Sequence, residues 1–360
     1  MKVAHFARYA PNACGLYEAA RDFVRLDVSA GYGAIFVDKG DREGKGRQPG
    51  AVDDRGGYRL VVQDYAAAKD ADLFVCHDFP DSAWLMETKA PILFVFHGKP
   101  LDCFRPEQNA QKAGSRAACE PGAYSLLAQA ARWPRTKKCL TMWQEHVEFW
   151  RPIIPEDKIA CTGDPVIDQE RFTPEGKTWK IPGELIGKWN VMIADSWRAD
   201  TDIYEIFHGA LIGCLRAGAR LHLYGLELTT DQKCLPCWEL LITYGQKLGL
   251  LGERWARVAD MEERYRAMDL VVTANRSTSR ILMEAMSCGC AVVGPTGNRH
   301  AQFTAHPQDA VEFGDAVCRA VNALKEGGRG LGGVVAKAAK AFGYETFGPK
   351  LHAIYKEIVR

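Results

Sequence analysis

Residues 268–294 of the chain read MDLVVTANRSTSRILMEAMSCGCAVVG. The apolar run up to Thr273 predicts a strand, the small polar residues after it predict a loop, and the stretch from about Ser279 predicts a helix. Glu284 falls about one and a half turns into that helix. The run CAVVG follows as a second strand, so the segment predicts a parallel strand–helix–strand unit.

The loop and the helix start of this unit favour the binding of a phosphate. The first backbone N–H groups of a helix have no partner within it, and the helix dipole adds partial positive charge there. A phosphate near Ser279 would bring the hydroxyls of an attached sugar within reach of Glu284. Every strand–helix unit has such a helix start, so this pattern does not by itself identify a ligand.

The same alternation of apolar strands with helical or turn-rich stretches extends over most of the chain. The helical stretches include residues 17–31 and 204–218. Continuous apolar runs are typical of parallel strands that are buried on both faces, and they predict an α/β fold with two doubly wound sheets. The expected strands are residues 2–7, 34–38, 60–63, 72–77, 92–97, 190–195, 220–225, 269–274 and 290–294.

A segment rich in Pro, Asp and Gly, IPEDKIACTGDPVIDQERFTPEG at 154–176, separates the two halves. We expect it to be a linker with a hinge at 161–174, between an N-terminal domain of residues 1–160 and a C-terminal domain of residues 161–341. Ligands of such sheets bind beyond the carboxyl ends of the strands, so we expect a cleft between the domains. The final helix, 342–360, has apolar residues at helical spacing and can pack on either domain.

Composition excludes several classes of protein. The chain has 360 residues, 46 Lys and Arg against 45 Asp and Glu, 47% hydrophobic residues and 25% charged residues. These values are those of a globular protein, and they exclude a disordered or fibrous chain and a strongly basic nucleic-acid-binding protein. We find no apolar run long enough to cross a membrane and expect a cytoplasmic protein whose 12 cysteines are reduced thiols.

Three segments carry a resemblance to a known family. LMEAMSCGCAVVG at 282–294 resembles the LEAMAxGxPVV motif of retaining glycosyltransferases of the GT-B fold, specifically glycosyltransferase family four. The segment 154–176 is similar to that family's interdomain stretch, and PNACGLYEAARDFV at 11–24 is similar to its glycine loop and first helix. The resemblance implies two Rossmann-like domains that face each other across a cleft.

The resemblance also implies the reaction. A sugar would pass from a nucleotide-diphosphate donor, with a UDP-sugar favoured, to an acceptor hydroxyl with retention at the anomeric carbon. The family generally needs neither a metal nor another cofactor, and we find no metal-binding DxD motif placed in the expected cleft.

In the C-terminal domain, the resemblance implies that Glu284 binds the ribose of the nucleotide. The family's other glutamate is replaced by Arg276, and its Gly-Phe-Gly by Ser277, Thr278 and Ser279, so backbone N–H groups would have to supply the contacts to the donor sugar.

The family holds the diphosphate with an Arg and a Lys in the loop after the first strand of this domain. Arg198 can supply one cation, but an acid near Asp202 occupies the lysine position. Arg276 or Arg280 can restore the lost charge, because a guanidinium binds phosphate oxygens in a bidentate manner. The alternative is that both arginines are solvated residues at the start of the helix.

In the N-terminal domain, His97 follows the run ILFVF and is expected beside the cleft, where the family has a histidine that contacts the donor sugar. With Arg198 and Glu284, it completes the expected catalytic set. A histidine after a strand can also be an ordinary core or surface residue. His77 and Asp78 have the same placement, and Gly15 would let the backbone approach the diphosphate or the acceptor. Asp102 is a candidate general base for an inverting reaction.

The acceptor is expected in the N-terminal domain. The segment RWPRTKK at 132–138 is strongly basic, and residues 39–47 add four cations against two acids. Such patches can hold a polyanion, so the acceptor is either a glycan or a hydroxymethylated base in DNA, as glycosylated in some bacteriophage genomes. The alternative is that these are solvated loops. The cationic residues of the first segment are Arg132, Arg135, Lys137 and Lys138.

Two other functions stay open. The replaced Glu and Lys can mark a protein that binds a nucleotide-sugar or a glycan without catalysis, and a nucleotide-sugar epimerase of the same fold would use a similar donor site. The sequence leaves open the nucleotide base, the sugar, the acceptor and the oligomeric state.

Overall fold

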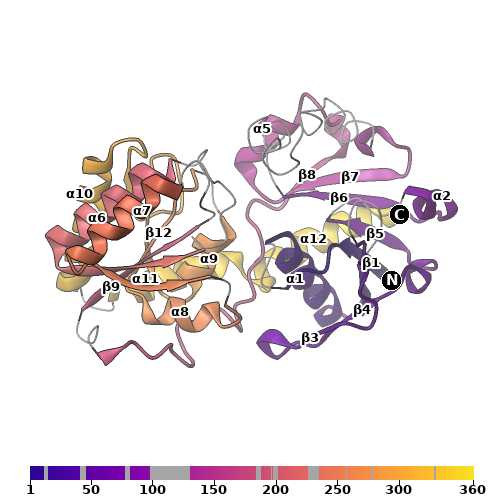
Figure 1. The fold of residues 1–360 in the computed structure, drawn as a ribbon. Helices are drawn as coiled ribbons and strands as arrows, with labels where there is room; N and C mark the ends of the chain where they lie inside the picture. Colours follow the sequence, from indigo (N-terminus) through magenta and orange to yellow (C-terminus); the bar gives the residue numbers. More distant parts are fainter. Residues whose placement is uncertain are drawn as a thin grey trace. The chain divides into compact units, whose positions relative to one another are not determined.

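The computed structural model divides the chain into two compact units, Met1–Asp168 with Phe342–Arg360 and Gln169–Ala341. Each unit is described by itself (Figure 1). The structure describes residues 1–11, 15–40, 46–77, 82–97, 130–183, 188–195, 197, 202–225, 235–256, 258–276, 279–327 and 330–360.

The first unit is built on an eight-stranded sheet in the order β3-β4-β2-β1-β5-β6-β7-β8. Its strands are parallel except for the antiparallel pair β3 and β4. Strand β1 lies between β2 and β5, as the winding of a doubly wound sheet requires. The strands are β1 Lys2–Ala7, β2 Gly33–Asp38, β3 Val52–Asp53, β4 Leu60–Gln63, β5 Leu73–Cys76, β6 Ile92–Phe96, β7 Thr136–Thr141 and β8 Ile159–Cys161.

Two long helices cover one part of this sheet. Helix α1 (Gly15–Ser29) packs on β1 and β2, and α12 (Tyr344–Val359), yellow in Figure 1, lies beside α1. The two helices share an apolar cluster in which the rings of Phe23 and Phe347 lie 5.2 Å apart. The C-terminal helix therefore packs in the first unit. The shorter helices are α2 Ser82–Glu87, α5 Val147–Trp150 and the 3₁₀ turns Arg55–Gly57, Tyr65–Ala68, Gln144–His146 and Glu156–Lys158.

The second unit has a six-stranded parallel sheet in the order β11-β10-β9-β12-β13-β14. The strands are β9 Trp189–Ala194, β10 Ala219–Tyr224, β11 Leu251–Trp255, β12 Leu270–Val272, β13 Ala291–Pro295 and β14 Phe303–Ala305. The helices are α6 Ile203–Ala217, α7 Leu235–Lys247, α8 Met261–Ala267, α9 Arg280–Ser287, α10 Ala310–Gly327 and α11 Gly330–Ala339, and the 3₁₀ turn Lys340–Phe342 follows them.

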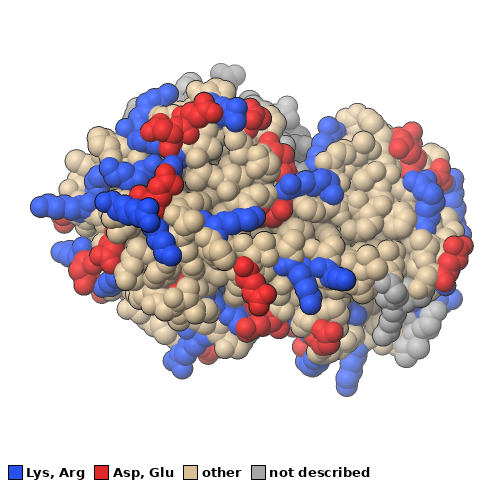
Figure 2. All heavy atoms as spheres, turned by 180° about the vertical axis from the view of Figure 1, so that it is seen from behind, with Lys and Arg blue, Asp and Glu red and all other residues tan. Residues whose placement is uncertain are grey.

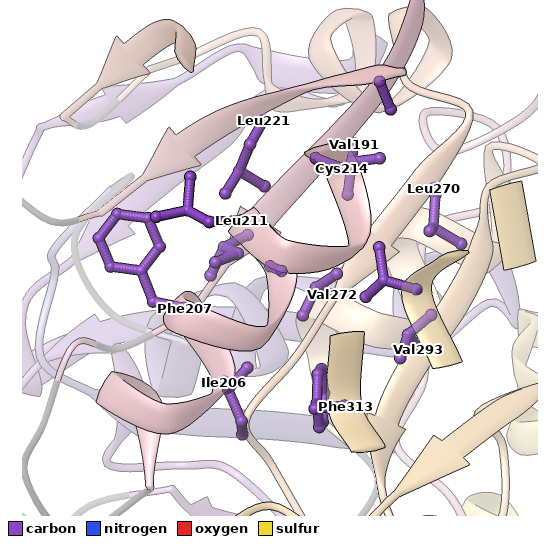
Figure 3. Close-up of a cluster of buried hydrophobic side chains, with 14 of the residues drawn as sticks. Val191, Ile206, Phe207, Leu211, Cys214, Leu221, Leu270, Val272, Val293 and Phe313 are labelled. Atoms are coloured by element: carbon purple, nitrogen blue, oxygen red, sulfur yellow. The ribbon is translucent and has the colours of Figure 1, made fainter. Parts of the chain in front are cut away.

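The core of the second unit lies between this sheet and the helices α6 and α10. Figure 3 shows side chains of α6, such as Phe207 and Leu211, directed toward side chains of the strands and of α10. Helices α6 and α10 approach closely because glycines face the contact: a Cβ on Gly213 would lie 2.6 Å from the carbonyl oxygen of Gly314. This packing holds the sheet, and with it the loops at the ends of the strands.

The predicted α/β fold with two doubly wound sheets is confirmed, and each expected strand is present with its ends shifted by at most a few residues. The strands β3, β7, β8, β11 and β14 were not expected from the sequence. Four of them lie at a sheet edge, and β7 lies next to one. Strand β7 carries the adjacent Lys137 and Lys138, and the other four strands are two to five residues long, so none forms a long apolar run.

Candidate functional site

The strand order of the second unit identifies where a doubly wound sheet of this kind binds a ligand. The chain winds from β9 through β10 to β11 in one direction and from β12 to β14 in the other, so the winding changes direction between β9 and β12. Ligands of such sheets bind beyond the carboxyl ends of the strands at this switch point. The residues that follow β9 and β12 are therefore the candidate site of this unit.

A buried carboxylate joins the two strand ends at the switch point. Asp195 follows β9 and is 4% exposed. Its Oδ2 accepts hydrogen bonds from the hydroxyl of Thr273 at 2.9 Å and from the backbone N–H of Ala274 at 2.6 Å. The side-chain amide of Asn275 donates to the same carboxylate at 3.1 Å, and Asn298 donates to the backbone carbonyl of Asn275 at 2.8 Å. These bonds hold the start of the loop that leads to α9.

Helix α9 begins where the sequence predicts. Ser279 is its N-cap, and the hydroxyl oxygen of Ser279 accepts a hydrogen bond from the backbone N–H of Leu282 at 3.4 Å. Glu284 is 8% exposed, and its Oε1 accepts a hydrogen bond from Nε of Arg280 at 2.6 Å. Arg280 is therefore not a solvated helix-start residue, because its side chain is only 14% exposed and is paired with the carboxylate predicted to hold the ribose.

The two departures from the family pattern lie in contact with each other. Nη2 of Arg276 lies 2.7 Å from Oδ2 of Asp202, just before α6, and the other carboxylate oxygen accepts a hydrogen bond from Gln308 at 3.2 Å. Asp202 has a φ of 52°, and no other non-glycine residue in the described ranges has a positive φ. Left-handed backbone at such a residue costs energy and concentrates at functional sites. The Arg276 side chain remains 58% exposed.

In the first unit, the winding changes direction between β1 and β5. His77 follows β5 and His97 follows β6, at the same edge of the sheet, because both strands are parallel. Nδ1 of His77 lies 3.0 Å from Nε2 of His97. His77 is buried and His97 is half-buried. The structure thus brings these two predicted residues together at the carboxyl edge.

The structure places the basic segment 132–138 elsewhere. It precedes or begins β7, whose first residue pairs with the first residue of β6, so it lies at the edge opposite His97. The Arg135 guanidinium donates to the carbonyl oxygens of Leu85 and Ala90, and Lys138 forms an ion pair with Glu357 at 2.6 Å. Arg135 and Lys138 are engaged within the fold, whereas Arg132 and Lys137 are exposed. The structure therefore separates the four cations into two with partners in the fold and two with exposed side chains, and their role toward an acceptor stays a prediction.

Other predicted residues complete the set. Gly15 is the first residue of α1, and a Cβ there would meet nothing within 4 Å, so space does not demand glycine. The predicted residues Arg198, Ser277, Thr278, Asp78 and Asp102 lie outside the described residues.

Within the described ranges, no group of three or more His, Cys, Asp or Glu side chains is arranged to hold a metal ion. The described cysteines are free thiols, and burial raises the pKa of several, to about 12 for Cys139. No helix in the described part of the chain is long and apolar enough to cross a membrane.

Sequence reasoning missed the polar residues that support the site. His5 lies within the apolar run of β1, and Asp27 lies on α1, where an acid is typical of a solvent-exposed face. Both are fully buried. Asp195 and Asn275 belong to the predicted strand ends, and a search for polar residues directly after parallel strands can find them.

Comparisons with known proteins agree on the fold. No protein-family model matches the chain, and no curated protein does. Among solved structures, sucrose-phosphate synthase from Thermosynechococcus elongatus superposes with a TM-score of 0.71 at 12% identity and covers 99% of both chains. HepE from Anabaena, solved with UDP and glucose, gives 0.69 at 13% identity and covers 99% of this chain and 100% of its own.

A putative UDP-N-acetylglucosamine 2-epimerase from Listeria monocytogenes gives a TM-score of 0.57 at 10% identity over 99% of this chain and 95% of its own. Over its full length, the chain therefore has the fold of GT-B glycosyltransferase structures, with two units that are each built on a parallel sheet.

We predict that Asp195→Ala lowers the free energy of unfolding by about 3 kcal/mol, because it removes the acceptor of two buried donors, Thr273 and Ala274, and of the half-buried Asn275 amide. Asp315→Ala is the matched control: its carboxylate is half-exposed and pairs with Arg216 on the surface, so we expect a loss below about 1 kcal/mol. Chemical denaturation of both variants measures the difference. Equal losses would contradict a structural role of Asp195 at the switch point.

Proposed function

We propose that this chain is a glycosyltransferase that moves a sugar from a nucleoside-diphosphate donor, with a UDP-sugar favoured, to an acceptor hydroxyl with retention. The observation that carries the proposal is the group of residues at the β9/β12 switch point. Asp195 holds the loop after β12 in place. Helix α9 begins at the end of that loop, so its first N–H groups lie at the switch point. Arg276 belongs to the loop, and Arg280 and Glu284 belong to the helix.

In this proposal, the start of α9 binds the diphosphate and Glu284 accepts hydrogen bonds from the ribose hydroxyls. Negative charge is favoured at a helix N-terminus, and free N–H groups can donate to phosphate oxygens. Arg280 holds the Glu284 carboxylate in place through its Nε. The pair thus presents a carboxylate whose orientation is set before the nucleotide arrives, which lowers the entropic cost of binding.

The Arg276–Asp202 pair adds a cation to this site, with the acid and the cation in swapped positions relative to the family pattern. The family pattern has a lysine where this chain has an acid near Asp202, and a glutamate where it has Arg276. Because the two side chains touch at 2.7 Å, a guanidinium occupies nearly the place that a lysine at 202 would reach. Arg276 then supplies the positive charge that stabilises the departing diphosphate, and a guanidinium can bind two phosphate oxygens at once.

The transfer itself needs stabilisation of the leaving diphosphate and orientation of the acceptor. A diphosphate oxygen can take the proton of the attacking hydroxyl, so no protein nucleophile is required. His97 at the carboxyl edge of the first unit contacts the sugar in this scheme. Retention follows from the resemblance of residues 282–294 to retaining enzymes, and no metal is expected in the reaction.

Within the proposal, the acceptor is a glycan hydroxyl rather than a hydroxymethylated DNA base. Arg135 and Lys138 are engaged within the fold at the sheet edge opposite His97. On the face drawn in Figure 2, Lys and Arg side chains are interspersed with Asp and Glu. The described residues on this face therefore form no extended basic surface of the kind that duplex DNA requires.

We predict that Glu284→Ala weakens the binding of the nucleoside diphosphate about 10- to 100-fold, because each hydrogen bond to a charged group contributes about 1.5–3 kcal/mol. Glu326→Ala, at an exposed position on α10, is the control and should leave the affinity unchanged. Titration calorimetry measures both. Unchanged affinity in a folded Glu284→Ala variant would remove this residue from the site.

We predict that Arg276→Ala and Asp202→Ala have opposite effects. Loss of the guanidinium should lower the affinity for the nucleoside diphosphate about tenfold and the affinity for the monophosphate less, because Arg276 binds the diphosphate in our proposal. Loss of Asp202 removes a competitor for the same guanidinium and should keep or raise the affinity. Calorimetry with both nucleotides measures this. Weaker binding in both variants would show that the pair only supports the fold.

We predict that the protein transfers sugar to a glycan acceptor and that the product keeps the anomeric configuration of the donor. Proton NMR of the product reports the configuration, and radiolabelled donor with glycans, plain DNA and hydroxymethylated DNA reports the acceptor. Binding without any release of sugar would favour a binding protein. A changed sugar with no acceptor present would favour an epimerase.

A further inference from the structure

A line of four polar side chains runs from the interior of the first unit to the carboxyl edge of its sheet. Oδ2 of Asp27 lies 2.9 Å from Nε2 of His5, and Nδ1 of His5 lies 3.4 Å from Nε2 of His77. Nδ1 of His77 lies 3.0 Å from Nε2 of His97. Asp27 and His5 are fully buried, His77 is 3% exposed, and His97 at the end is half-buried.

The line places two imidazoles and a carboxylate in the interior, where apolar side chains are usual. The line crosses three neighbouring strands, since His5 lies on β1, His77 follows β5 and His97 follows β6. Burying polar side chains is unfavourable unless each is hydrogen-bonded, and here both ring nitrogens of His5 and of His77 have a polar partner in the line. The line ends at the residue that the proposed function places against the donor sugar.

The hydrogen bonds of the line have a direction. An imidazole with one proton donates at one nitrogen and accepts at the other. Burial, and next the neighbouring His97 and His5, lower the pKa of His77 well below its usual value, so this ring is neutral near pH 7. A neutral His77 that donates to His5 must therefore accept from His97, and one that accepts from His5 must donate to His97.

The end at Asp27 decides which direction holds. A carboxylate only accepts, so Nε2 of His5 donates to Asp27. Nε2 of His352 on α12 lies 2.8 Å from the other carboxylate oxygen, Oδ1. Burial, and next the Asp27 charge, raise the pKa of Tyr355, so this neighbour stays a neutral phenol. When the Nε2 proton is the only proton of His5, its Nδ1 accepts from Nε2 of His77, and Nδ1 of His77 accepts from Nε2 of His97.

We propose that Asp27, His5 and His77 are positioning residues that fix the tautomer and ring orientation of His97, so that its Nε2 carries the proton and its Nδ1 acts as a hydrogen-bond acceptor for a hydroxyl of the donor sugar. Which nitrogen of a histidine is protonated is set by the bond that the other nitrogen makes. The role of the sugar rests on the proposed function, whereas the tautomer does not.

The test uses Asp27→Asn in the full chain. A side-chain amide can either accept from Nε2 of His5 or donate to it, so the variant permits both directions of the line at nearly unchanged volume. His352→Gln is the matched control, because a glutamine at 352 still offers an N–H donor to Asp27 and lies outside the path to His97. His97→Asn identifies the signals of the His97 ring by their loss.

The first readout is the two-bond ¹H–¹⁵N correlation spectrum of protein labelled at its histidines. We expect His97 in the wild type and in His352→Gln to be protonated at Nε2 alone, and Asp27→Asn to shift Nδ1 toward the protonated position. A wild-type His97 protonated at Nδ1, or averaged between tautomers, overturns the proposal. An unchanged His97 spectrum in Asp27→Asn overturns it as well. Neither outcome depends on whether the protein binds a nucleotide.

The second readout is calorimetry with the nucleotide-sugar and with the nucleoside diphosphate alone. We expect Asp27→Asn to lower the affinity for the nucleotide-sugar about tenfold. The affinity for the nucleoside diphosphate should stay unchanged, since His97 contacts only the sugar in the proposed function. Equal weakening of both ligands would show a merely structural role and overturn the positioning role. If the wild type binds neither ligand, the proposed function fails, while the tautomer is still decided by the first readout.

Discussion

The buried carboxylate of Asp195 is the contact on which the candidate donor site depends. It stands at the end of the first strand of its sheet and accepts hydrogen bonds from Thr273, Ala274 and Asn275 at the end of the neighbouring strand. A buried charge is stable only when it is fully hydrogen-bonded, so the carboxylate and the loop constrain each other. The position of α9 follows from this loop, and with it the positions of Arg276, Arg280 and Glu284.

The first unit uses a buried carboxylate in a related way. Asp27 on α1 is bonded to His5 of β1 and, in our proposal, sets the direction of the hydrogen bonds that end at His97. In both units, a buried carboxylate thus takes part in the hydrogen bonds that orient side chains or backbone at the carboxyl edge. Preorganised dipoles of this kind stabilise charge without reorganisation during a reaction.

The sequence predicts the fold well because its central strands are continuous apolar runs, which only doubly covered parallel strands require. It also places Ser279 at the start of α9 and Glu284 within the helix, as the structure has them. Edge strands such as β11 escape prediction because they carry polar residues.

The supporting residues of the first unit escape prediction for a different reason. Acids such as Asp22 and Asp27 of α1 are typical of solvent-exposed helix positions, but α12, from the far end of the chain, contacts both of them. Such burial depends on a long-range contact that no local pattern contains. The basic segment 132–138 misleads in the same way, because the partners of Arg135 and Lys138 are carbonyls and an acid distant in sequence.

In our proposal, the second unit binds a nucleoside diphosphate. Thermal unfolding of the protein with UDP, GDP, ADP, dTDP and CMP and with their sugar conjugates measures such binding. A ligand at 100 times its Kd stabilises the folded protein by about 2.7 kcal/mol, which raises the Tm by a few degrees. We expect one diphosphate and its sugar conjugate to raise the Tm, with UDP favoured, and CMP to leave it unchanged. An unchanged Tm with every one of these nucleotides at millimolar concentration would show that the second unit binds no nucleoside diphosphate.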